Sequence, residues 1–152
     1  MNDWIALLYT NLAAQFLLLI GAVWCVAAPT RRIYPMSDKG LVYYAMWALF
    51  YFVFASNFAF VILDWNSGIW SSPWRFVIGA PVALLGAACV SWGIATLGLK
   101  NTSGSAADGF VSSGPYAFTR NPQYLGDICL FIGVAIIANS EVVLVTHLLT
   151  SL

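Results

Sequence analysis

The longest polar segment of the chain, residues 100–124, holds the side chains best suited to binding a charged ligand. Asn121-Pro122 predicts the start of a helix, because Asn121 can cap free amides and Pro122 needs no amide hydrogen at the first helical position. A helix start carries a partial positive charge and unpaired N–H groups, and the guanidinium of Arg120 lies beside it. Together these groups predict a site for a carboxylate or a phosphate.

Two tyrosines and two glycines flank this expected helix start. Tyr116 and Tyr124 could stack on an aromatic group or hydrogen-bond to a ribose. Gly114 and Gly126 would let a ligand or another helix approach the backbone closely. The segment therefore combines turn-forming residues with groups that bind small molecules, which is typical of a functional loop.

Asp127 follows directly inside the expected helix and is costly in an apolar environment unless it pairs. We expect its partner to be Arg120 or Lys100. The chain's single histidine, His147, lies in a short apolar segment. We interpret it as a helix-facing or interfacial residue without a catalytic role.

The composition excludes a soluble globular protein. Of the 152 residues 61% are apolar, 16% aromatic and 8% charged, whereas a soluble domain has roughly a quarter charged residues. The net charge is zero, so the chain lacks the excess of basic residues that is typical of nucleic-acid-binding proteins. The three cysteines stand singly, so no metal-ligand spacing is present and no metal site is expected. The chain is expected to be an integral membrane protein.

Apolar stretches at residues 5–28, 41–63 and 76–99 each give a helix of about 35 Å, long enough to cross a bilayer. A fourth stretch, 124–138, gives about 22 Å and is followed by the polar sequence Asn139-Ser140-Glu141 and a partial span at 142–152. Either one long helix continues through this break, or the chain turns back. We expect the second, a short helical hairpin. The predicted fold is one all-α transmembrane domain, 1–152, with four to five helices.

The basic residues predict the orientation of the chain. Five of the six fall in the first and third loops, which places those loops, including the loop 100–123, in the cytoplasm and the N-terminus outside. Only Arg75 lies in the opposite loop, together with Trp65, Trp70 and Trp74. These tryptophans are typical of an interfacial aromatic belt.

Two patterns predict how the helices pack. Gly79, Gly86 and Gly93 recur every seven residues and form a smooth stripe that a neighbouring helix can approach closely. Polar side chains inside the first two spans are expected to hydrogen-bond between helices; they are Asn11, Gln15 and Asn57.

The stretch SGPYAFTRNPQYLGDI, residues 113–128, closely resembles the signature of the isoprenylcysteine carboxyl methyltransferase and phospholipid methyltransferase superfamily. That pattern is Gly-Pro-Tyr, a few residues, Arg-(His or Asn)-Pro, any residue, and Tyr-Leu-Gly. The preceding segment LGLKNTSG resembles the corresponding segment of bacterial members. With it, the resemblance covers about thirty residues, 97–128.

The resemblance implies a helical membrane enzyme that binds S-adenosylmethionine at the cytoplasmic face, here of a bacterial inner membrane. A lipophilic methyl acceptor, such as an isoprenoid thiol carboxylate, a phospholipid amine or a small thiol, would enter from the bilayer. Arg120 would face the carboxylate of the cofactor and, with Tyr124, take part in catalysis. The implied cofactor cradle is Gly114, Pro115, Tyr116, Arg120, Asn121, Pro122, Tyr124 and Gly126.

The sequence departs from the superfamily at its C-terminal end. Members normally continue through another helix into a cytoplasmic tail with a Glu-Glu pair, whereas this sequence ends at Leu152. The alternative to an enzyme is a non-catalytic relative that serves as a structural subunit, in a homo-oligomer or with other membrane subunits. Sterol reductases, which use a nicotinamide cofactor, share part of the motif, but the chain is short for that group.

Overall fold

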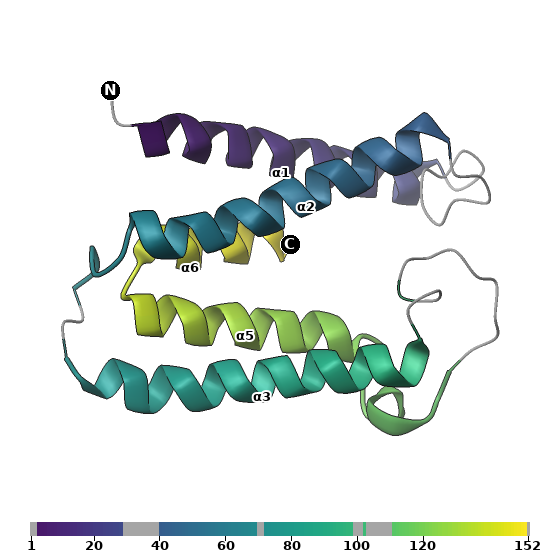
Figure 1. Cartoon of the computed structure of the whole chain (residues 1–152). Helices are drawn as coiled ribbons and strands as arrows, with labels where there is room; N and C mark the ends of the chain where they lie inside the picture. The colour runs from purple at the N-terminus through teal and green to yellow at the C-terminus, as the bar shows by residue number, and fades with distance from the viewer. Residues whose placement is uncertain (1–2, 29–39, 70–71, 99–101, 103–110, 152) are drawn as a thin grey trace.

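The computed structural model describes residues 3–28, 40–69, 72–98, 102 and 111–151 (Figure 1). These residues form helices and connecting turns and no strand, which confirms the predicted all-α class. The elements are α1 (Asp3–Ala27), α2 (Leu41–Leu63), α3 (Trp74–Leu97), the short 3-10 helix η2 (Gly114–Ala117), α5 (Pro122–Ala138) and α6 (Glu141–Thr150).

Three helices are long and apolar enough to cross a membrane: Trp4–Ala27, Leu41–Leu63 and Trp74–Leu97. The helices α5 and α6 are apolar but shorter. Figure 1 shows the helices aligned as a bundle, with α5 beside α3 and α6 beside α2. The chain is therefore an integral membrane protein in which two short helices pack among three longer ones.

The break after α5 is a tight turn between two helices. Asn139 takes the left-handed conformation, with φ 51° and ψ 50°, which ends α5 as glycine or asparagine commonly does. Ser140 then caps α6, since its hydroxyl accepts a hydrogen bond of 3.1 Å from the amide of Val143. The predicted hairpin is confirmed, and the single long helix is wrong because Asn139 reverses the chain.

The closest helix pair is α3 and α5, which meet through glycines on both sides. A Cβ added at Gly79 would lie 2.7 Å from the carbonyl oxygen of Gly133, and one at Gly126 would lie 2.8 Å from that of Gly86. A Cβ at Gly86 would collide with the backbone nitrogen of Leu130. The predicted stripe is confirmed, and its partner is a second row of small residues on α5.

A buried polar network joins α1, α2 and α6. Gln15 Nε2 donates to Asn11 Oδ1 at 2.6 Å and to the carbonyl of Thr146 at 3.0 Å. Asn11 Nδ2 donates to Ser56 Oγ, and Thr146 Oγ1 donates to Asn57 Oδ1 at 2.7 Å. The expected hydrogen bonding between spans is thus confirmed, and it also includes α6. Each such bond typically contributes about 1 kcal/mol or less in a membrane.

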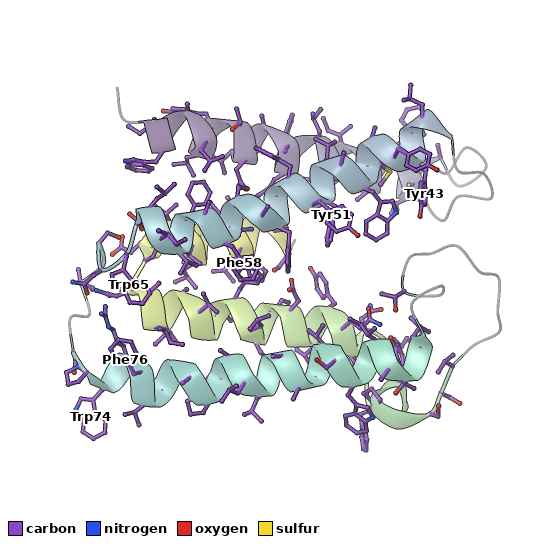
Figure 2. All side chains as sticks on the ribbon, viewed as in Figure 1. Tyr43, Tyr51, Phe58, Trp65, Trp74 and Phe76 are labelled. Carbon is purple, nitrogen blue, oxygen red and sulfur yellow. The ribbon has the colours of Figure 1, made fainter. Side chains whose placement is uncertain are left out.

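Aromatic side chains gather at the end of the bundle that holds the α2–α3 connection. Figure 2 shows Trp65, Trp74 and Phe76 there, at the opposite end from Tyr43. The guanidinium of Arg75 lies 4.8 Å from the ring centroid of Phe76 and 5.5 Å from that of Trp65. Trp65 and Trp74 are both exposed, as expected of an interfacial belt, whereas Trp70 lies outside the described residues.

Replacing Gly86 by alanine tests the contact between α3 and α5. We expect Gly86→Ala to lower the free energy of unfolding by about 1–3 kcal/mol, because the new methyl group meets backbone that cannot move aside. Unfolding of the purified protein in mixed micelles, followed by tryptophan fluorescence, measures the change.

Gly21→Ala is the matched control. Outside its own helix turn, no described atom lies within 4 Å of a Cβ at Gly21, and alanine favours a helix more than glycine does. Equal stability of the two variants would show that the α3–α5 contact does not depend on glycine.

Candidate functional site

A cavity of about 630 Å³ lies at the end of the bundle where α5 begins. The helices α2 and α3 contribute apolar side chains to its lining, and the segment before α5, α5 itself and the end of α6 contribute mostly polar ones. Its volume is in the range of small-molecule sites. The lining residues are Phe50, Phe54, Val90, Leu97, Thr102, Val111, Tyr116, Arg120, Asn121, Gln123, Tyr124, Asp127, Thr150 and Ser151.

A second cavity, of about 450 Å³, lies at the opposite end of the bundle beside the α5–α6 turn. Its described lining residues are mostly apolar, and among them Glu141 is charged and none is a lysine or arginine. The first cavity has Arg120 on its wall and is therefore the better candidate for an anionic ligand.

The start of α5 differs from the expectation in one respect. Pro122 occupies the first turn and Asn121 the capping position, as predicted. The side chain of Asn121 makes no capping hydrogen bond, however, because its backbone has φ −132° and ψ 64°, away from the extended geometry of most caps. Asn121 lines the cavity instead. Its predicted capping role is therefore wrong.

The Gly-Pro-Tyr turn forms η2 and packs against α3. Gly114 has φ +57°, and a Cβ there would lie 2.9 Å from Thr96 Oγ1, so glycine is needed both for the backbone and for the space. Pro115 is buried within this contact. The turn thereby holds Tyr116 at the cavity wall.

Hydrogen bonds connect the turn to α5. Gln123 Nε2 donates to the hydroxyl oxygen of Tyr116 at 3.0 Å and to Thr102 Oγ1 at 3.2 Å. Partial burial raises the pKa of Tyr116 above its usual value, against a smaller opposite effect of the Gln123 hydrogen bond. Tyr116 therefore stays a neutral phenol at physiological pH. Tyr124, further along α5, donates its hydroxyl hydrogen to the carbonyl of Ser151 at the end of α6.

The eight residues proposed for the cofactor cradle separate into two groups. Tyr116, Arg120, Asn121 and Tyr124 line the cavity. Gly114, Pro115, Pro122 and Gly126 instead pack toward α3, where Pro122 O accepts a 3.2 Å hydrogen bond from the thiol of Cys89. The first group can contact a ligand, and the second shapes the wall that carries it.

Asp127 has a different partner from the expected one. Its Oδ2 lies 3.7 Å from Nε2 of His147, so it pairs with the histidine rather than with Arg120. Lys100, the other expected partner, lies outside the described residues. This pair could not be predicted from local sequence patterns, because α6 brings His147 back along α5 only through the tight turn at Asn139.

Two further parts of the cavity lining lie outside the sequence motif and are not predicted from it. Phe50 and Phe54 come from α2, and Thr150 and Ser151 from the end of α6. The i, i+4 spacing of the two phenylalanines placed them on one helix face, but a uniformly apolar helix does not reveal which face meets the site. In the described part of the chain, no cluster of histidine, cysteine, aspartate or glutamate could hold a metal ion.

Fold and site together define an all-helical membrane protein with a small-molecule cavity at one end of the bundle. Residues 74–152, just over half of the chain, match the model of the phospholipid methyltransferase family. The chain therefore belongs to that family, which confirms the resemblance seen in residues 113–128. It is a member of a family of membrane methyltransferases. No curated protein and no solved structure matches the chain.

Replacing Gly114 by alanine tests the position of the η2 turn. We expect Gly114→Ala to lower the melting temperature, with a cost of about 1–3 kcal/mol from the left-handed backbone and the collision with Thr96. Thr96→Ala in the same chain removes the collision, so the double variant is expected to recover part of the loss. Thermal unfolding monitored by tryptophan fluorescence measures both, and an unchanged melting temperature in the single variant would contradict the observed packing.

Proposed function

We propose that this chain transfers a methyl group from S-adenosylmethionine to a lipophilic acceptor at the membrane surface. The observation that carries the proposal is the cavity whose wall bears Arg120, Asn121, Tyr116 and Tyr124, all within the family motif. When bound, S-adenosylmethionine supplies a methyl group on a positively charged sulfur, which a nucleophile takes by in-line displacement.

The donor set of the cavity fits that cofactor. The guanidinium of Arg120 offers a planar, bidentate partner for the amino-acid carboxylate. Tyr116 and Tyr124 offer ring faces and oxygens for the adenosine part, and the side-chain amide of Asn121 both donates and accepts. Binding and orientation by these groups, which bring donor and acceptor into line, are the main contribution that methyl transfer requires of the protein.

The apolar wall supports a lipophilic acceptor. Phe50 and Phe54 from α2 and Val90 from α3 contribute apolar side chains to the cavity lining beside its polar groups. Such a lining suits the chain of a lipid while its head reaches the polar groups, and it keeps water away from the reacting atoms. We further propose that the chain resides in a bacterial inner membrane with this end cytoplasmic and the N-terminus outside, as the basic loop residues suggest.

Loss of Arg120 tests the proposed cofactor site. We expect Arg120→Ala to weaken binding of S-adenosylmethionine at least about tenfold, because a charge-assisted pair contributes about 1.5–3 kcal/mol. Calorimetric titration of the detergent-solubilised protein measures the affinity.

The matched control is Arg75→Ala. Arg75 is half-buried at the opposite end of the bundle, where its Nη1 donates to Asn66 Oδ1, and it does not line the cavity. Equal binding by the parent and Arg120→Ala would reject Arg120 as the carboxylate partner, and weakened binding by Arg75→Ala would reject the location of the site.

A further inference from the structure

Asp127 and His147 form a pair between the cavity and the interior of the bundle. Asp127 stands one helical turn beyond Tyr124 on α5, and its side chain lines the cavity with a third of its surface exposed. His147 comes from α6 and is 3% exposed. The carboxylate thus has the cavity on one side and an imidazole nitrogen, 3.7 Å away, on the other.

The imidazole of His147 is held in place by packing rather than by hydrogen bonds. Its ring stacks on Phe131, with centroids 4.2 Å apart and planes 18° apart. Neither ring nitrogen has a hydrogen-bond partner among the described residues, and 3.7 Å to Asp127 exceeds hydrogen-bond length. Burying such a group without a hydrogen-bond partner lowers the stability of the fold. An apolar side chain of similar size would fill the same space without that cost.

We propose that Asp127 is a catalytic residue that takes a proton from an amine acceptor, and that His147 is the residue that positions its carboxylate. This inference rests on the proposed methyltransferase function. It assigns a role to two side chains that the cofactor site does not use.

The chemistry requires such a group when the acceptor is an amine. A protonated amine has no lone pair on its nitrogen. One N–H bond must therefore break first, with its proton passing to Asp127 Oδ. The freed nitrogen lone pair then forms the N–C bond to the methyl carbon while the S–C bond breaks and its electron pair stays on sulfur. The products are a methylated ammonium and S-adenosylhomocysteine, and Asp127 returns its proton to water.

The charges around the cavity favour an amine over a carboxylate acceptor. Among the described residues, the titratable groups that line the cavity with Asp127 are Arg120, Tyr116 and Tyr124, and His147 packs behind it. The lining residues from α2 and α3 are apolar. A cationic amine placed beside Asp127 is attracted by the carboxylate and by the aromatic side chains of Phe50 and Phe54, whereas an acceptor carboxylate at the same position is repelled. Arg120, the cation of the described lining, is engaged by the cofactor carboxylate in the proposed function.

The test compares the parent protein with Asp127→Asn and Asp127→Glu in vesicles of phosphatidylethanolamine and phosphatidylcholine. Transfer of tritiated methyl groups to lipid is measured, and binding of S-adenosylhomocysteine is titrated in parallel. We expect Asp127→Asn to lose at least about 100-fold in rate while its affinity for S-adenosylhomocysteine changes less than about twofold. Asp127→Glu, which keeps the carboxylate, is expected to retain part of the rate.

The pH profile separates a proton acceptor from a structural residue. The residual rate of Asp127→Asn is expected to rise about tenfold per pH unit above neutrality, because only the neutral fraction of the amine reacts, and the parent is expected to rise less steeply. His147→Gln is expected to lose rate with an intermediate slope. Glu141→Gln, at the opposite end of the bundle, is the matched control and is expected to match the parent.

Several results would overturn the inference. If Asp127→Asn kept the rate or the pH slope of the parent, Asp127 would not be the proton acceptor. If that variant lost binding of S-adenosylhomocysteine, the role of Asp127 would be structural. A parent that binds S-adenosylhomocysteine but, in the same vesicles with an added isoprenylcysteine, methylates the carboxylate of that compound instead of phosphatidylethanolamine would refute the amine acceptor and leave the proposed function standing. A parent that does not bind S-adenosylhomocysteine would refute both.

Discussion

Close contact between α3 and α5 is the constraint on which the rest of the structure depends. Glycines on both helices let the two backbones touch, and in a bilayer such packing replaces the hydrophobic effect as the source of helix association. The contact fixes the start of α5, where Pro122 lies against α3, and α3 also supports the turn that carries Tyr116. The position of the motif residues around the cavity, both those on α5 and those in the turn before it, therefore follows from the contact between these two helices.

The polar network on the other side of the bundle completes the site. Gln15 and Asn57 bind α6 through Thr146, which places His147 next to Asp127 and brings the end of α6 to the cavity wall. Buried amide and hydroxyl groups are directional, so they specify the rotation of α6 more sharply than apolar contacts between smooth helices would. The short helix α6, with ten residues, thus acquires a defined face toward α5.

The sequence allowed the local features and the presence of polar contacts between spans to be predicted, but not which side chains from distant segments meet around the cavity. The spans, the hairpin turn and the glycine stripe follow from composition, from Asn139-Ser140 and from a seven-residue repeat, because each is encoded by neighbouring residues. The pairing of Asp127 with His147 and the use of Phe50 and Phe54 as a cavity wall depend on how helices rotate about their axes. A nearly uniform apolar helix such as α2 carries little information about that rotation.

Photolabelling tests the central claim most directly, namely that the motif end of the bundle binds S-adenosylmethionine. The purified protein would be irradiated with the radiolabelled cofactor, digested, and the labelled peptide identified by mass spectrometry. The account predicts label on the lining residues of the larger cavity, within residues 111–127 or at Thr150 and Ser151. Label confined to Gly68, Ile69 or residues 135–145, which line the cavity at the opposite end, would contradict it.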